Sequence, residues 1–393
     1  MSRIVVVGGG IFGLTAADEL TGRGWDVTVI ERGTVPDPLA ASTDISKVIR
    51  MEYGADREYM ALGEKAIEGW HRWNDMFADA FGEVVYHETG VAMFCMESMR
   101  GGGFEHESYQ SLLARGHEPE RATREVVSRF PAWNANVFVD GFYHQRGGFA
   151  ESGKVVTFLA KLLRNRGVEF RESTRAVGVV ARDGRAVGVR LADGTTCEAD
   201  AVLIAAGAWT EKLIPELRGF VSGTGHPVFH LKPSRPGLFQ ADVFPTFTAD
   251  VARTGYYGFP LSSEGVVKIG VHALGTPTDA DGERTVTEDQ VQRLRSFLEH
   301  TFPVLATDPI VYTRLCLYAD TPDEHFLVAR HPTLDGLTIA SGGSGHGFKF
   351  APVLGDLIAD AVEGTRRDLS DRFGWRVGQQ LEEGREAARC HDF

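Results

Sequence analysis

The N-terminal segment MSRIVVVGGGIFGLTAADEL constrains the fold of this 393-residue chain more than any other part of it. A β-branched run at residues 3–7 leads directly into Gly8, Gly10 and Gly13, which are spaced as G-x-G-x-x-G, and then into the helical pattern LTAADELTGRG. Glycines at these positions let the backbone approach a phosphate group, which the N-terminus of the helix also attracts. The segment therefore predicts the first strand, turn and helix of a dinucleotide-binding unit.

A second β-rich run at residues 26–30 completes this unit and ends in Glu31, which Arg32 follows. An acid at this position can accept hydrogen bonds from the ribose of an adenosine, and it would repel the 2′-phosphate of NADP. Strand, helix, second strand and terminal acid agree, so we predict that Gly8, Gly10, Gly13, Glu31 and Arg32 contact a bound dinucleotide. FAD and NAD are the two candidates.

The segment AVGVVARDGRAVGVRLADGTTCEADAVLIAAGAW distinguishes between these two cofactors. Two Asp-Gly turns divide three β-rich runs, which predicts a meander that finishes in a parallel-type strand at residues 201–205. The turn after this strand, AAG, ends at Gly207 and resembles the second FAD contact of flavoproteins similar to glutathione reductase. This order favours FAD, with Val177 and Gly207 as further cofactor contacts. Cys197 lies within the meander and is expected to be a packed strand residue.

The composition excludes several classes of function. With 43% hydrophobic and 24% charged residues and a net charge of −13, the chain is typical of a soluble globular protein without a basic face for nucleic acid or an anionic membrane. No apolar run reaches about 18 residues and the N-terminus lacks a signal-peptide pattern, so we expect a cytoplasmic protein. The four cysteines are widely separated without a CxxC, which predicts neither a metal site nor a disulfide framework.

The remainder of the chain predicts a second domain that is interleaved with the first. Helical patterns occupy residues 55–80 and 288–300, strand-like pieces lie between residues 227 and 313, and a last helix follows SGGSGHGFKF. No second dinucleotide fingerprint occurs. We therefore predict an FAD-binding domain formed by residues 1–80, 145–220 and 320–393, and a substrate domain formed by residues 81–144 and 221–319.

Five ordered motifs give this chain a family resemblance over nearly its whole length: VVVGGGIFGLTAADEL, DISKVIRMEYG, YYGFPLSSEGVVKIGVH, RLCLYADTPDEHFLVARHP and SGGSGHGFKFAPVLG. They resemble the FAD-dependent secondary-amine oxidases, which include monomeric sarcosine oxidase, pipecolate oxidase and the fructosyl-amino-acid oxidases, or amadoriases. The resemblance implies an α/β fold in which a Rossmann-like FAD-binding domain of the glutathione-reductase type is interleaved with a mostly antiparallel substrate domain. It also implies oxidation of a C–N bond, with O2 reduced to H2O2.

Two residues carry the most specific of these expectations. Cys316 matches the cysteine that forms a thioether to the 8α-methyl group of the flavin, although a packed thiol is the ordinary role of a strand cysteine. Lys268 matches a lysine over the flavin that promotes oxygen reduction, although a strand lysine is otherwise most often solvated. A fixed ammonium in a poorly hydrated pocket would stabilise the negative charge that develops on oxygen.

Further residues match the family's substrate and cofactor contacts. Arg50 and Lys349 correspond to the pair that binds the substrate carboxylate, and an ordinary ion pair is the alternative for each. Lys47 stands in DISKVIR where sarcosine oxidases commonly carry an arginine, and we place it at the substrate site. His272 and Tyr257 correspond to side chains that line the substrate cavity, with a role in the hydrophobic core as the alternative.

The glycine-rich turn before the last helix is expected to contact the flavin. Gly345, His346 and Gly347 belong to this turn, and Lys349 follows it. The N-terminus of the helix would then face the C2 carbonyl of the flavin and stabilise negative charge on the reduced ring. The glycines would permit a close approach of the backbone.

The substrate is less constrained than the cofactor. The D-x-x-K motif and GGSGHGF resemble the amadoriases, which favours fructosyl amino acids slightly over sarcosine, other N-methyl amino acids or pipecolate. An FAD dehydrogenase that uses an acceptor other than oxygen, or a flavin-binding module without turnover, would fit the same fold. We expect a monomer whose partners are a small N-substituted amino acid and O2.

Overall fold

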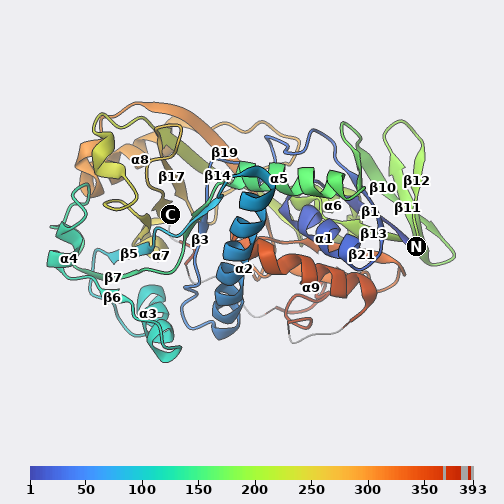
Figure 1. Ribbon diagram of the computed structural model, residues 1–393, viewed down its shortest axis with the longest axis horizontal. Helices are drawn as coiled ribbons and strands as arrows, with labels where there is room; N and C mark the ends of the chain where they lie inside the picture. The colour runs from blue at the N-terminus through green and yellow to red at the C-terminus, as the bar shows by residue number, and fades with distance from the viewer. Residues whose placement is uncertain (366–368, 382–387, 391–393) are drawn as a thin grey trace.

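In the computed structural model the chain forms an elongated molecule with one large β-sheet in each half (Figure 1). The structure describes residues 1–365, 369–381 and 388–390, and within these residues one sheet has six strands and the other nine. The six-stranded sheet is mainly parallel and the nine-stranded sheet is mainly antiparallel. This arrangement confirms the predicted fold class, whereas the exact domain boundaries stay a prediction.

The parallel sheet lies between a helical layer and a small antiparallel sheet. In spatial order its strands are β20 (Leu327–Arg330), β21 (Leu337–Ser341), β13 (Ala201–Ile204), β1 (Arg3–Val7), β2 (Asp26–Ile30) and β9 (Glu169–Arg171). The helices are α1 (Ile11–Gly22), α5 (Ser152–Asn165) and α9 (Ala351–Glu363), and the meander is β10 (Ala176–Arg182), β11 (Arg185–Leu191) and β12 (Thr196–Glu198). Ile4 and Val6 pack against the helices, while Val5 and Val7 pack against the meander, as the alternation of side chains along a strand requires.

The nine-stranded sheet encloses an aromatic core in the other half. Its strands are β18 (Thr276–Pro277), β14 (Ser222–Leu231), β17 (Val267–Val271), β16 (Tyr256–Gly258), β15 (Thr246–Ala249), β5 (Val91–Cys95), β7 (Asp140–His144) and β6 (Glu120–Arg121), with β19 (Ile310–Asp320) paired to β14. Trp133 contacts Phe94, Phe247 and Phe302 edge to face, a geometry that aromatic rings prefer. Helix α8 (Glu288–Thr301) covers this core, close to its predicted bounds of 288–300.

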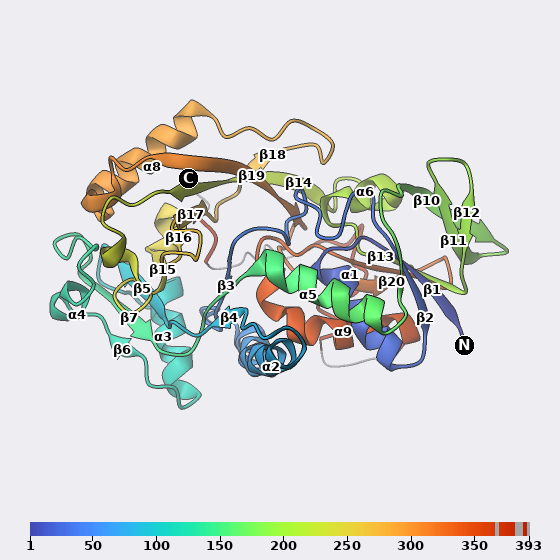
Figure 2. The ribbon, with the colours of Figure 1, turned by 45° about the horizontal axis from the view of Figure 1, so that its top comes forward.

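Strands β14 and β19 form the longest pairing in the fold and extend toward the parallel sheet (Figure 2). Their register places Cys316 opposite His226, and the pairing of β14 with β17 places Lys268 opposite His230. The predicted flavin-binding cysteine and the predicted oxygen-reducing lysine therefore lie on one sheet, separated by a single strand.

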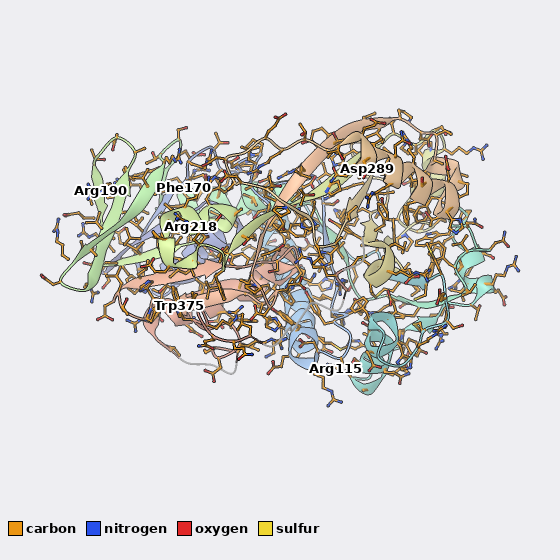
Figure 3. All side chains as sticks on the ribbon, turned by 180° about the vertical axis from the view of Figure 1, so that it is seen from behind. Arg115, Phe170, Arg190, Arg218, Asp289 and Trp375 are labelled. Carbon is orange, nitrogen blue, oxygen red and sulfur yellow. The ribbon has the colours of Figure 1, made fainter. Side chains whose placement is uncertain are left out.

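Helix α2 (Arg57–Phe81) lies between the two halves. Its bounds are close to the helix predicted over residues 55–80. The side chain of Asp56 accepts a hydrogen bond from the amide of Tyr59 and starts this helix, and Gly82 ends it in the left-handed region. Figure 3 shows the molecule from behind, with Arg190 in the meander at one end and Asp289 in α8 toward the other. The remaining elements are β3 (Lys47–Ile49), β4 (Tyr86–His87), β8 (Gly148–Ala150), α3 (Phe104–Ala114), α4 (Arg124–Ser128), α6 (Thr210–Leu213) and α7 (Val251–Thr254).

Candidate active site

A groove with about 1510 Å³ of empty space, open solvent included, follows the carboxyl ends of the parallel strands, where α/β sheets bind ligands. Gly8 and Gly10 line it directly after β1. Gly8 has a φ of +115°, and a Cβ there would lie 2.4 Å from the carbonyl oxygen of Ala205, so a side chain cannot be accommodated. Gly13 lies outside this lining, because it is the contact point of α1 with the turn: its Cβ would lie 1.9 Å from the oxygen of Gly8. The groove and its glycine wall fit a dinucleotide.

Glu31 and Arg32 both line the groove at the end of β2. The Glu31 carboxylate accepts hydrogen bonds from the amides of Gly9 at 2.8 Å and Gly33 at 3.2 Å, and burial raises its pKa. Arg32 pairs with Asp281 at 2.6 Å, and its guanidinium lies 4.7 Å from the centre of the Trp209 ring. Glu31 is thus fixed by the glycine turn, and Arg32 is held by residues from later in the chain.

The lining of the groove also contains four more of the predicted cofactor contacts. Val177 and Gly207 line it from the first meander strand and from the turn after β13, and Gly345 and Gly347 line it from the turn before α9. A Cβ at Gly345, whose φ is +74°, would lie 2.1 Å from the ring of Tyr318. The sequence near the C-terminus therefore completes a groove that begins at the N-terminus.

A smaller cavity with about 600 Å³ of empty space adjoins the groove. Five predicted substrate or catalytic residues line it together with His346, which was predicted to contact the cofactor: Lys47, Arg50, Tyr257, His272, His346 and Lys349. Lys47, Tyr318, Gly345 and Phe348 line both spaces. A molecule in the cavity would therefore lie next to a molecule in the groove.

Buried aromatic rings hold the two cations of the predicted carboxylate site. The Arg50 guanidinium lies 5.0 Å from the ring centre of Tyr53 and 5.3 Å from that of Phe104. Lys349 Nζ donates a hydrogen bond to the Tyr53 hydroxyl at 2.8 Å, and this hydroxyl lies 2.9 Å from Nδ1 of His346. Tyr53 thus joins three predicted residues, although the sequence analysis did not select it.

Tyr257 and His272 extend from neighbouring strands toward Tyr318. Burial raises the pKa of both tyrosines, so their hydroxyls stay protonated at neutral pH. The ring of Tyr318 stacks on that of His226 with 3.7 Å between centroids, and burial with nearby Arg389 holds the pKa of His226 well below its usual value. Tyr318 is a wall between the groove and the cavity that sequence reasoning missed.

Lys268 lies in neither cavity lining among the residues that the structure describes, and it is 1% exposed rather than solvated. Its ammonium lies 2.8 Å from Oδ2 of Asp44 and donates a hydrogen bond to the carbonyl of Ser46. Burial lowers the pKa of Lys268 to about 8, although Asp44 opposes this shift. The lysine is therefore a buried cation with a carboxylate partner.

Cys316 is also 1% exposed, and the next residue of its strand, Leu317, lines the groove. Its Sγ lies 4.0 Å from Nζ of Lys47, which contributes to both spaces. The other cysteines, Cys95, Cys197 and Cys390, are buried without a disulfide. Cys316 is thus a thiol directly behind the wall of the groove.

Comparisons with known proteins agree with this geometry. The sequence profile of the family described as FAD dependent oxidoreductase matches residues 3–361. The chain belongs to this family. L-saccharopine oxidase from Schizosaccharomyces pombe is 26% identical over 98% of this chain and 95% of that protein, and monomeric sarcosine oxidase from a Bacillus species is 28% identical over 93% and 94%. A solved structure of an Amadoriase I mutant from Aspergillus fumigatus superposes with a TM-score of 0.82 at 26% identity, covering 95% of this chain and 89% of that one. The predicted family resemblance is confirmed.

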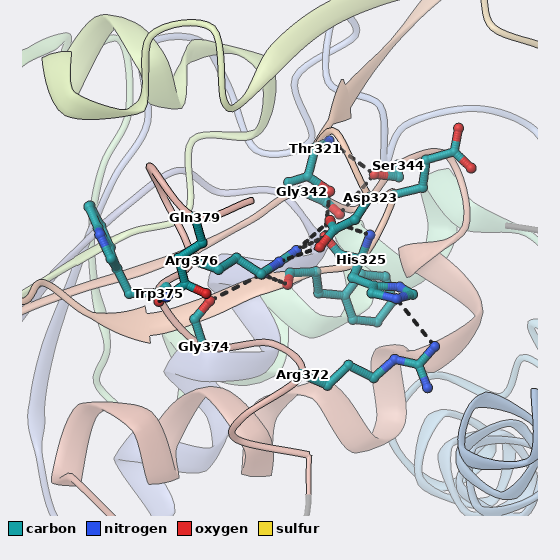
Figure 4. Close-up of polar contacts among 12 residues, drawn as sticks. Thr321, Asp323, His325, Gly342, Ser344, Arg372, Gly374, Trp375, Arg376 and Gln379 are labelled. Atoms are coloured by element: carbon teal, nitrogen blue, oxygen red, sulfur yellow. Dashed lines mark hydrogen bonds and ion pairs between the residues drawn. The ribbon is translucent and has the colours of Figure 1, made fainter. Parts of the chain in front are cut away.

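In this FAD-dependent oxidoreductase the C-terminal segment fixes the loop that connects β19 to β20 (Figure 4). Arg376 pairs with Asp323 at 2.5 Å and donates to the carbonyl of His325 at 2.9 Å, while Arg372 reaches His325 Nε2 at 3.4 Å. The amide of Thr321 donates to Ser344, one residue before Gly345. The loop after the cysteine strand thus contacts the glycine turn of the groove through Thr321 and Ser344, and it is braced by two arginines, Arg372 and Arg376, that lie outside the five motifs.

Among the described residues, no helix is long and apolar enough to cross a membrane. The described residues also contain no group of three or more His, Cys, Asp or Glu side chains placed to hold a metal ion.

Proposed function

We propose that this chain is an oxidase of secondary-amine amino acids that binds FAD in the groove and the amino acid in the adjoining cavity. The observation that carries this proposal is the joining of the two spaces by shared walls, with Arg50 and Lys349 in the smaller one. When bound, FAD takes up a hydride equivalent from the carbon next to the substrate nitrogen and passes the electrons to O2, while water hydrolyses the resulting imine.

The residues of the cavity would bind and orient the amino acid. The planar fork of Arg50 suits a carboxylate, and Lys349, held by Tyr53, adds a compact positive charge. A cationic cavity lowers the pKa of a bound amine, and oxidation requires the amine in its neutral form. His272 and Tyr257 line the same space and would position the nitrogen.

Two buried residues would serve the cofactor. Cys316 lies directly behind the groove wall and would attach the flavin by a thioether. Lys268 would stabilise the negative charge that develops on oxygen, because an ammonium acts strongly where water is excluded. With these roles the electron acceptor is O2 and the product is H2O2.

Within this class we favour fructosyl amino acids. The D-x-x-K motif at Asp44 and Lys47 and the similarity to an amadoriase structure support this choice. Sarcosine or another N-methyl amino acid and pipecolate remain the alternatives, and the relative that acts on saccharopine adds a fourth candidate.

The test measures H2O2 from the purified holoenzyme with fructosyl-glycine, sarcosine, L-pipecolate and L-saccharopine side by side. We expect oxidation of at least one of them, with the highest kcat/KM for fructosyl-glycine. Turnover only with an added quinone acceptor would overturn the oxidase assignment and favour a dehydrogenase. Turnover of none of the four with either acceptor would overturn the substrate class.

A further inference from the structure

Asp44 lies at the centre of the charged groups around Lys268. Its Oδ2 is 2.8 Å from Nζ of Lys268 and 3.9 Å from Nζ of Lys47, and its Oδ1 is 3.5 Å from Nε2 of His230. The Asp44 side chain is 3% exposed. One carboxylate therefore faces two lysines and an imidazole that come from three different strands or loops.

The backbone holds Asp44 firmly in this position. Its own Oδ1 accepts a hydrogen bond from the amide of Ile45 at 2.7 Å. Its carbonyl accepts from the hydroxyl of Ser152 at 2.8 Å and from the amide of Gly153 at 2.9 Å, at the start of α5. The carboxylate thus has little freedom to leave Lys268.

A buried lysine is costly to keep charged, because burial removes the water that stabilises an ammonium. The groups that face Lys268 are Asp44, Lys47, His230 and Cys316, and its ammonium also lies 4.8 Å from the ring centre of Phe259. Asp44 is the carboxylate of this set. The second cation, Lys47, acts in the opposite direction and favours the neutral amine.

We propose that Asp44 is a positioning residue that keeps Lys268 protonated and directs its ammonium, so that the lysine can act in oxygen reduction. This inference rests on the proposed function, because it concerns the role given there to Lys268. Two ammonium groups share one carboxylate, so the cluster of Lys47, Lys268 and Asp44 keeps one positive charge. The carboxylate therefore holds Lys268 in its charged form without cancelling the field of the cluster.

The pKa shifts of Asp44 and Lys268 agree with this assignment and give the direction of the effect expected when Asp44 is replaced. Burial opposes a charge on Asp44, yet Lys268, His230 and Lys47 together hold the pKa of Asp44 well below its usual value. Burial lowers the pKa of Lys268 to about 8, and Asp44 raises it. Removal of the carboxylate should therefore lower the pKa of Lys268 further.

The test compares wild-type holoenzyme with Asp44→Asn by stopped-flow reoxidation of the anaerobically reduced enzyme, across a pH series. In the wild type the rate should be high below about pH 8 and fall above it, as Lys268 loses its proton. In Asp44→Asn this fall should move to lower pH by about one unit or more, so the variant is on the order of tenfold slower near pH 8. Its rate should approach that of the wild type at about pH 6.

A second measurement is independent of turnover. NMR of holoenzyme labelled with ¹³C at the lysine ε carbons, with the Lys268 signal assigned from Lys268→Met, should show the same downward shift of its titration in Asp44→Asn. Asp44→Glu keeps a carboxylate and should titrate near the wild type, and Asp44→Ser replaces Asp44→Asn if the latter does not fold. Asp308→Asn is the control, since Asp308 is buried but accepts a hydrogen bond from the amide of Ser234.

The possible outcomes distinguish a failure of the role proposed for Asp44 from a failure of the role proposed for Lys268. Reoxidation of Lys268→Met that is as fast as in the wild type overturns the proposed role of Lys268 itself. If Lys268→Met is slow at every pH but Asp44→Asn keeps the wild-type pH profile and NMR titration, the role of Lys268 stands and the role of Asp44 is overturned. The role of Asp44 is supported if the titration of Lys268 shifts to lower pH in Asp44→Asn but stays near the wild type in Asp44→Glu and Asp308→Asn.

Discussion

Among single residues, Cys316 bears most directly on the proposed attachment of FAD. Its thiol is buried, and the ammonium of Lys47, which lines the groove, is 4.0 Å from the sulfur. This position agrees with the proposed attachment to a flavin in the groove, in addition to the packing role that most strand cysteines have.

Replacement of this sulfur tests the attachment directly. Wild-type protein precipitated by acid should stay yellow and have the mass of the chain plus one FAD, whereas Cys316→Ser should release its flavin and give a colourless pellet. Cys197→Ser is the matched control, because Cys197 is a buried strand cysteine in the meander and should leave the pellet yellow. A colourless wild-type pellet, or a yellow one from Cys316→Ser, would contradict covalent attachment through this residue.

The sequence could not predict site residues whose role depends on a contact with a residue far away in the chain. Arg50 and Lys349 could be selected because they match the family's pair that binds the substrate carboxylate, and the structure brings both into one cavity. Tyr53 contacts Lys349 across 296 residues, so its part in the site depends on the completed fold. Asp44 was seen only as the first letter of D-x-x-K, because its contact with Lys268 spans 224 residues of chain.

At the scale of elements, helix α1 packs closely on the turn that follows β1. The α-carbon of Gly13 faces the carbonyl of Gly8 so closely that a Cβ would lie 1.9 Å from the oxygen. This contact is local, since both residues belong to one G-x-G-x-x-G turn, and it explains why this unit could be predicted from sequence. The start of the last helix was also predicted correctly, because α9 begins at Ala351, directly after SGGSGHGFKF, although the 3₁₀ turn at Gly347–Phe350 within that motif was not predicted.

Two alanine substitutions in the same helix should therefore have opposite effects. Gly13→Ala forces α1 away from the turn, and we expect it to destabilise the protein by about 1–3 kcal/mol or more and to reduce the flavin content. Gly22→Ala meets nothing within 4 Å, so it should be neutral or stabilise the protein by up to about 1 kcal/mol, with full flavin content. Thermal unfolding and flavin absorbance of the two variants measure both effects. A Gly13→Ala protein as stable and as yellow as the wild type would contradict the packing argument.

At the scale of the whole molecule, Asp281 links the two halves over the nucleotide groove. It lies between β18 and α8 of the antiparallel half, and its carboxylate contacts Arg32 at 2.6 Å, the indole N–H of Trp209 at 2.7 Å and Lys212 at 2.8 Å. These partners belong to the parallel-sheet half. The sequence could not predict this link, because a loop acid without a motif gives no sign of its partners.

Loss of this link should lower the stability of the protein by a small amount that depends on salt concentration. Asp281→Ala should lower the stability of the holoenzyme by about 1–2 kcal/mol at low ionic strength, because a network of partly exposed ion pairs contributes modestly. The effect should shrink in about 0.5 M salt, where the charges are screened. Asp289→Asn, which removes an exposed carboxylate from α8, should stay within about 0.5 kcal/mol of the wild type. Equal melting temperatures of Asp281→Ala and wild type at low salt would contradict the link.

The placement of Cys316 and Lys268 on one sheet has a consequence for how such proteins can change over time. Both side chains belong to strands that pair with β14, so any movement of the sheet carries them together. Of the residues that line the substrate cavity, Arg50, Val251 and Phe348 lie on other segments of the chain. Mutations in those segments can alter the size or charge of the cavity without altering the spacing between cysteine and lysine. With the roles proposed above for Cys316 and Lys268, selection for a new amino acid substrate can therefore proceed while the cofactor chemistry is inherited unchanged.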